Sequence, residues 1–241
     1  MIKYVYKEKY DYILSFGSMC STSLFLRKNG FRSKSCFFDW LTSDFFGNID
    51  VVNCDFKDYF SKCYLVQKFK DYPHLITNEK YGFTYSHVFN PKETFAKQEA
   101  KVKARIQRSI DSFKMCLKQN TLLIYYCRND EEQDRILNSA EIIKTFCEKH
   151  KVDLVFIFNN VVSTAFPFLS FVVPYNNIHH PFEDSVSYPI EGGESEKLLK
   201  WLDCRYNQKQ KEINLRYKHK IPLLLRLKNK MQKKRKNKLI I

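Results

Sequence analysis

Short apolar runs alternate along the chain with longer segments in which apolar residues recur every three or four positions. A continuous apolar run of four to eight residues is typical of a strand covered on both faces, and the helical spacing is typical of an amphipathic helix. The runs predict strands at Tyr12–Phe16, Thr121–Cys127, Val152–Phe158 and Phe168–Pro174, and the spacing predicts helices at Ser21–Lys28, Thr94–Leu117, Glu131–His150 and Glu194–Tyr217.

The order strand, helix, strand between Thr121 and Phe158 is a βαβ unit, which builds a parallel sheet with a right-handed crossover. The sequence therefore predicts an α/β fold, a single layered domain with a mostly parallel sheet flanked by helices, plus a basic C-terminal helix. We place the domain at residues 1–215 and the basic amphipathic tail at 216–241. Residues 41–62 mix polar and aromatic positions, which predicts short helices and loops, and Tyr81–Phe89 is a candidate strand that Asn90-Pro91 ends.

The turn after the first strand carries candidate chemistry. Gly17-Ser18 breaks the apolar run, and Cys20 stands at the head of the first predicted helix. The amides and the dipole at a helix N-terminus favour negative charge and lower the pKa of a thiol. We therefore consider Cys20 a candidate thiolate nucleophile. The alternative is a small, buried and inert cysteine.

The segment around Cys20 resembles the signature of a bacterial family described as putative papain-like cysteine peptidases, otherwise a domain of unknown function. The family pattern reads S-L-G-x-x-C, then L-R-x-x-G-L-R-x-x-S, then P-F-D-W; here Phe16 replaces the Leu and Phe37 replaces the Pro. A second block, Tyr81-Gly82-Phe83 followed by Ser86-His87-Val88-Phe89, is similar to the family's Y-G-x-x-F-x-H-D-F, with Val88 where Asp is common. The matching positions of the first block are Ser15, Gly17, Cys20, Gly30, Arg32, Ser35, Phe38, Asp39 and Trp40.

The resemblance implies a thiol enzyme, and it makes a papain-like α+β fold the alternative to the layered α/β architecture. A cysteine nucleophile needs a base, and the base needs a group that orients it. His87, at the end of a predicted strand and inside the second block, is the first candidate for the base. His180, in the His179-His180 loop, is the rival, because sites in α/β proteins assemble in loops at strand ends. Asp39 either orients the base or holds the backbone of its own turn.

Arg32, Arg128 and Ser18 are the candidates for substrate binding. Arginines that converge near the nucleophile suit a carboxylate or phosphate on a substrate, and Ser18 lies in the glycine turn. The turn matches neither a P-loop nor G-x-G-x-x-G. The eight cysteines are scattered, with no C-x-x-C and no paired Cys/His spacing. The sequence therefore predicts no metal site, no cofactor and no disulfide framework.

The net charge of +15 is concentrated at the end of the chain, where Arg216 to Lys238 holds eleven Lys and Arg and no acid. Pro222 can begin a helix that places Leu223, Leu224, Leu227 and Met231 on one face, among basic residues. A basic amphipathic helix is typical of binding to an anionic membrane surface, which we expect for residues 218–241. Binding of nucleic acid by the basic cluster is the second interpretation, and a solvated disordered tail is the third.

The start of the chain is too charged for a signal peptide, and no apolar run reaches the roughly 18 residues of a membrane-spanning helix. The scattered cysteines fit a reducing compartment. We expect a cytoplasmic protein, peripheral at the inner membrane.

The leading functional hypothesis is a cysteine-nucleophile enzyme, a peptidase, amidase or acyl-transfer enzyme, that uses Cys20 with His87 or His180 near the membrane surface. The resemblance makes a peptide the default substrate, and the residues themselves allow a glycan-type substrate equally. A second hypothesis is a non-catalytic accessory protein of surface polysaccharide synthesis that binds glycan or lipid intermediates. A third is a nucleic-acid-binding module that uses the tail.

Overall fold

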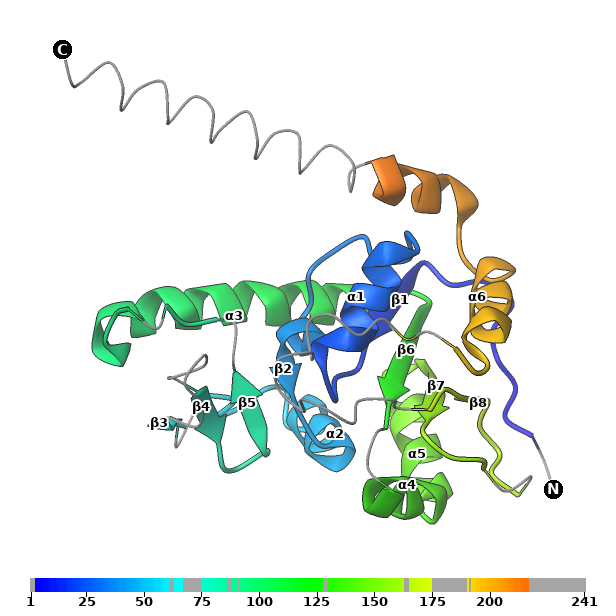
Figure 1. Cartoon of the computed structure of the whole chain (residues 1–241), viewed down its shortest axis with the longest axis horizontal. Coiled ribbons are helices and arrows are strands. Elements are labelled where there is room, and N and C mark those ends of the chain that lie inside the picture. Colours follow the sequence, from blue (N-terminus) through cyan, green and yellow to red (C-terminus); the bar gives the residue numbers. More distant parts are fainter. Residues whose placement is uncertain are drawn as a thin grey trace.

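The computed structural model describes residues 3–60, 63–66, 75–85, 88–90, 92–127, 130–162, 165–174, 190 and 192–216, with the backbone alone at 63–66 and 75–77. These residues form two sheets with helices around them (Figure 1). One sheet is parallel and the other is antiparallel, and in the view the long helix α3 (Phe95–Leu117) runs above the antiparallel sheet and ends near β1 of the parallel one.

The parallel sheet has the strand order β1-β6-β7-β8, formed by Tyr12–Ser15, Thr121–Tyr126, Asp153–Phe158 and Ser170–Val172. Its register pairs Ile13 with Leu122 and Ile124 with Val155. The predicted α/β class and the parallel sheet flanked by helices are confirmed. The continuous apolar runs form strands that are covered on both faces, since β6 and β7 are buried at every position.

Alternate residues of these strands enter two separate cores. Leu14, Leu123 and Phe156 face the larger core, where α3 packs together with α2 (Phe45–Asn53), α4 (Asp130–Leu137) and α5 (Ala140–His150). Ile13, Leu122 and Val155 face the second core, where α1 (Cys20–Lys28) and α6 (Ser195–Asp203) pack. The sheet is therefore the middle of three layers.

The second sheet was not predicted. Its strands are antiparallel in the order β2-β5-β4-β3, and they are short: Leu41–Thr42, Phe83–Tyr85, Leu75–Asn78 and Cys63–Val66. The 3-10 helix η1 (Phe37–Trp40) leads directly into β2. The expected strand Tyr81–Phe89 is reduced to β5, because residues 81 and 82 belong to the turn that precedes it.

Two predicted helices are interrupted. The helix expected over Glu131–His150 is divided into α4 and α5 at Asn138-Ser139, where the Asn138 side chain donates to the Asp134 carbonyl (2.9 Å) and competes with the helical backbone. The helix expected over Glu194–Tyr217 is α6 followed by a separate helix at 208–216. Between them Tyr206 is buried and pairs with Tyr10 in a parallel bridge, which a continuous helix would not allow.

Within the described ranges, no helix has the length and apolar character that crossing a bilayer requires. The predicted basic helix of the tail lies outside the described residues, apart from Arg216 at the end of the helix at 208–216.

Phe38→Ala should lower the free energy of unfolding by about 3–5 kcal/mol, because the ring is fully buried and packs against Phe16, Phe37 and Phe113. Val161→Ala is the control, since Val161 is 84% exposed, and it should change stability by less than about 0.5 kcal/mol. Urea denaturation followed by circular dichroism measures both variants. Equal losses would contradict the central place of Phe38 in the larger core.

Candidate active site

A left-handed turn follows β1 and redirects the chain into α1. Gly17 has φ +100° and Ser18 has φ +67°, a region that costs a residue other than glycine about 1 kcal/mol or more. A Cβ atom on Gly17 would lie 2.3 Å from the Ser43 Oγ and 2.6 Å from the Asn48 Nδ2. Glycine is therefore required by both the backbone angle and the close approach of these two side chains.

Hydrogen bonds hold the turn in this conformation. The Ser18 N–H donates to the Ser43 Oγ (3.1 Å), and the Ser43 N–H donates to the Ser18 carbonyl (3.4 Å). The Asn48 Nδ2 donates to the Phe16 carbonyl at 2.6 Å. Because Ser43 follows β2 and Asn48 lies in α2, the turn is fixed to the segment that leaves the antiparallel sheet.

Cys20 is the first residue of α1, at the edge of the parallel sheet where the strands have their carboxyl ends. The preceding residue, Met19, is extended and supplies no side-chain cap. The positive end of the helix dipole lies at Cys20. A helix N-terminus favours a thiolate, whereas burial favours the neutral thiol. Cys20 is 5% exposed.

Two hydroxyl side chains follow Cys20 in the same helical turn. Ser21 and Thr22 are buried, and neither hydroxyl has a hydrogen-bond partner among the described residues. A buried polar group without a partner costs about 1–3 kcal/mol. The beginning of α1 thus places two buried hydroxyls without a described partner directly after Cys20.

Glu132 is a half-buried acid at the same edge of the sheet. Its Oε1 accepts the Tyr125 hydroxyl (2.5 Å) and the Phe45 N–H (2.8 Å), and its Oε2 accepts the Cys127 thiol (3.5 Å). Burial raises the pKa of Glu132, and these hydrogen bonds oppose the shift. Phe45 stands two residues after Ser43, so one short segment connects Glu132 to the turn before Cys20.

Asp39 is bound within its own loop. Its Oδ2 accepts the Cys36 N–H (2.7 Å) and pairs with the Arg32 Nη2 (2.6 Å), and both charged side chains are more than nine-tenths buried. Burial raises the pKa of Asp39, while Arg32 and the Cys36 amide act in the opposite direction. The sequence leaves open whether a histidine or an arginine is the partner of Asp39. Among the described residues, the partner is Arg32.

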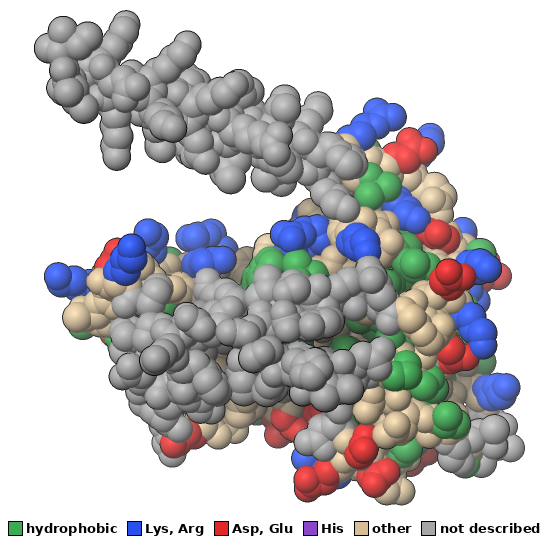
Figure 2. Space-filling model, viewed as in Figure 1, with side chains coloured by type: hydrophobic (Ala, Val, Ile, Leu, Met, Phe, Trp, Pro, Cys, Tyr) green, Lys and Arg blue, Asp and Glu red, His purple; other side chains and the backbone are tan. Residues whose placement is uncertain are grey.

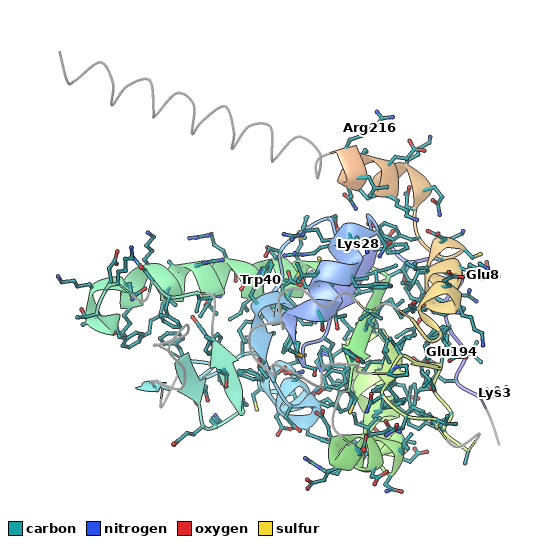
Figure 3. The ribbon with its side chains drawn as sticks, viewed as in Figure 1. Lys3, Glu8, Lys28, Trp40, Glu194 and Arg216 are labelled. Atoms are coloured by element: carbon teal, nitrogen blue, oxygen red, sulfur yellow. The ribbon has the colours of Figure 1, made fainter. Side chains whose placement is uncertain are left out.

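Arg32 holds the loop that leads into η1 rather than projecting into open space. Its Nε donates to the Lys34 carbonyl (3.1 Å) and its Nη2 to the Ser35 hydroxyl (2.8 Å). The guanidinium also lies 5.4 Å from the ring centroid of Trp40, and Arg27 of α1 lies 5.8 Å from the same centroid. Figure 3 labels Trp40 at this junction between α1 and α3.

The structure thus brings Ser18 and Cys20 together at the start of α1, and it pairs Arg32 with Asp39 at η1. The other predicted site residues, His87, His180 and Arg128, lie outside the described residues. Sequence reasoning missed Ser43, Asn48 and Glu132. An acid in the first turn of the helix after the central strand was the available signal for Glu132, whereas the pattern contained no signal for Asn48.

In the described part of the chain, no group of three or more His, Cys, Asp or Glu is arranged to hold a metal ion. None of the seven cysteines whose side chains are described forms a disulfide.

A family model described as putative papain-like cysteine peptidase matches residues 11–164. The match begins just before β1 and ends after β7, so it covers both Cys20 and His87 and stops before His179-His180. No curated protein and no solved structure matches the chain.

Arg32→Met should lower the free energy of unfolding by about 3–5 kcal/mol, because it leaves the buried Asp39 carboxylate without its counter-ion. Arg27→Met is the matched control, since Arg27 contacts the same Trp40 ring from an exposed position, and it should cost less than about 1 kcal/mol. Chemical denaturation measures both variants. Similar losses would mean that the contact with Trp40, rather than the ion pair, is what Arg32 contributes.

Proposed function

Because the chain belongs to the family described as putative papain-like cysteine peptidase, we propose that it is a thiol hydrolase that cleaves peptide or amide bonds with Cys20 as the nucleophile. The observation that carries the proposal is the position of Cys20. It opens α1 directly behind a rigid left-handed turn, at the edge of the sheet where α/β sites assemble.

The proposed reaction begins with attack of the Cys20 thiolate on the substrate carbonyl carbon. The carbonyl electron pair moves to the oxygen, and the positive end of the α1 dipole lies on the side where it would stabilise the oxyanion. Collapse of this intermediate expels the amine, which takes a proton from the imidazolium, and leaves a thioester on Cys20. Water, deprotonated by the neutral imidazole, then attacks the thioester, releasing the acid and regenerating the Cys20 thiolate and the imidazolium.

We assign the imidazole to His87 in the first place. The family match includes His87 together with Cys20, and it ends before the rival His180. We assign Asp39 a positioning role, because its carboxylate is already bound to Arg32 and to the Cys36 amide. Under this assignment Asp39 supports the loop before β2, and through β2 it supports Ser43 and the turn before Cys20.

We further propose that the enzyme works at an anionic membrane surface, to which residues 218–241 attach it. The support is the sequence, which places apolar residues on one face of a potential helix and Lys and Arg around it. A substrate that is itself held at the membrane, such as a peptide- or glycan-bearing precursor, would then meet Cys20 at a raised local concentration.

Cys20 should react with iodoacetamide at pH 6 roughly ten-fold faster than Cys54 and Cys204 of the same chain. Cys54 and Cys204 are exposed and cap the C-termini of α2 and α6, where the helix dipole has the opposite sign, so they are internal controls. Peptide mapping by mass spectrometry gives the three rates over a pH range. A Cys20 thiol that is alkylated only after denaturation would refute the enzyme and favour the accessory protein with a packed cysteine.

The base is identified by the same measurement in His87→Ala and His180→Ala. We expect His87→Ala to abolish the fast reaction of Cys20 at pH 6 and His180→Ala to preserve it, because the thiolate is stabilised by the neighbouring imidazolium. The reverse result would transfer the role to His180.

The full chain should sediment with vesicles that contain anionic lipid. Substituting Arg226, Lys228, Lys230 and Lys233 by Gln should weaken the partition by about 4 kcal/mol at low salt, since each basic residue contributes about 1 kcal/mol. Leu223→Ser combined with Leu227→Ser keeps the charge and removes the apolar face, and it should also release the protein. Binding to RNA that depends on the same lysines, without vesicle binding, would favour the nucleic-acid interpretation instead.

A further inference from the structure

A hollow of about 400 Å³ lies between η1, β5 and α3, and Cys20 does not line it. Its volume falls in the range of small-molecule sites. One wall is aromatic and is formed by Phe37, Trp40 and Tyr85, and the opposite wall is the basic side of α3. No assignment made above uses this hollow.

The charged residues described in the lining of the hollow are all positive. Lys34, Arg105 and Arg108 line it, and none of the described residues that line it is acidic. Arg105 and Arg108 are one helical turn apart on α3, where two like charges repel each other. Figure 2 shows Lys and Arg side chains gathered over this helix.

The nearby acids do not neutralise these two arginines. On α3, Glu99 pairs with Lys103 (2.8 Å), and Asp111 accepts the Gln107 side chain (2.8 Å). Among the described residues, neither Arg105 nor Arg108 forms an ion pair. Two guanidiniums without a counter-ion beside a concave surface are the arrangement that binds a phosphate or carboxylate with paired hydrogen bonds.

The third cation is held in place by contacts that leave its charge uncompensated. The Lys34 Nζ contacts the Met115 Sδ (3.4 Å) and lies 5.6 Å from the centroid of the Tyr12 ring. Neither partner carries a charge. An anion with two negative charges therefore suits the hollow better than one with a single charge.

The aromatic wall is preorganised. Trp40 is half-buried, and its ring lies near the guanidiniums of Arg27 and Arg32, the second of which is fixed by Asp39. A ring that is already fixed loses little entropy when a ligand packs against it. The wall therefore offers a flat apolar surface to the organic part of an anionic ligand.

The hollow continues along α3. A second hollow of about 270 Å³ shares Arg105 and Val88 with the first and adds Lys101. The one acid among its described lining residues, Glu93, accepts the Asn90 side chain (2.8 Å). Lys101, Arg105 and Arg108 thus form a row at one-turn spacing, with Arg105 in the wall common to both hollows.

We propose that the hollow between η1, β5 and α3 is a binding site for a phosphate monoester, with the phosphate on Arg105 and Arg108 and the organic ring against Trp40. The phosphate supplies two negative charges and the oxygens that guanidinium groups bind in pairs. Binding here is independent of the proposed reaction at Cys20.

The experiment is a titration of the full-length Trp201→Phe protein, in which Trp40 is the remaining tryptophan and reports by its fluorescence. Phenylalanine at 201 keeps an aromatic ring beside Tyr6. Glucose 1-phosphate and adenosine monophosphate are the probes. Inorganic phosphate, which has no ring, is the control for the ring. Glucuronate, which carries a carboxylate in place of the phosphate, is the control for the type of anion. We expect saturable binding of at least one probe, tighter than that of either control.

Arg105→Glu and Arg108→Glu should each raise the Kd of the bound probe by roughly ten-fold or more. Lys97→Glu makes the same change of charge on the exposed surface of α3 outside the hollow, and it should raise the Kd by less than about two-fold. Circular dichroism verifies folding, and Cys20→Ala should bind the probe as the parent protein does.

Four results would overturn the proposal. The first is the absence of saturable binding up to about 10 mM. The second is equal weakening by Lys97→Glu, which would mean attraction by the overall charge. The third is binding of glucuronate as tight as that of glucose 1-phosphate, and the fourth is binding of inorganic phosphate as tight as that of both probes.

Discussion

The contact between the Gly17-Ser18 turn and the pair Ser43 and Asn48 determines where the rest of the site can lie. The loop after β1 is held in a left-handed conformation by hydrogen bonds from another part of the chain. The turn redirects the chain so that α1 packs on one face of the sheet, and it leaves Cys20 at the first residue of the helix. Because Ser43 follows β2, the same contact joins the parallel sheet to the antiparallel one. The cost of the strained backbone is thus offset by the hydrogen bonds that connect the two halves.

The buried ion pair of Arg32 and Asp39 has a comparable role on the other side of β2. Burying two charges is expensive, and such a pair persists only where its geometry satisfies both groups. Here the carboxylate also accepts the Cys36 amide, and the guanidinium also binds Ser35 and stacks near Trp40. The pair therefore fixes η1, and with it the aromatic wall of the basic hollow. The contribution of the ion pair is to position η1 rather than to add net stability, because apolar residues of similar size could fill the same volume at no cost in the free energy of unfolding.

The predictability of the fold followed the length and continuity of each element. The strands β6 and β7 and the helix α3 were evident because six or more residues in each obey one pattern. The strands of the antiparallel sheet have two to four residues and depend on pairing with other segments, so the local pattern indicated β5, inside the expected Tyr81–Phe89, and not the other three. The position of Cys20 at a helix start was predictable from Gly17-Ser18, whereas Asn48 and Ser43 became visible only through the approach of separate segments. The partner of Asp39 was likewise a question of three-dimensional structure, since the sequence offered nearby arginines and distant histidines as candidates.

The two proposed sites both depend on the short segment Leu41–Ser43, and each uses a different residue of it. β2 has two residues, Leu41 and Thr42; Leu41 lines the basic hollow, and Ser43, directly after the strand, binds the turn before Cys20. Pairing of Leu41 with Tyr85 fixes the hollow, while the hydrogen bonds of Ser43 fix the nucleophile. The nucleophile needs the positive end of a helix dipole, which acts over one turn, and the hollow needs full charges that remain attractive to an anion in the presence of solvent. A single short strand can serve both because it contributes backbone position to each and charge to neither.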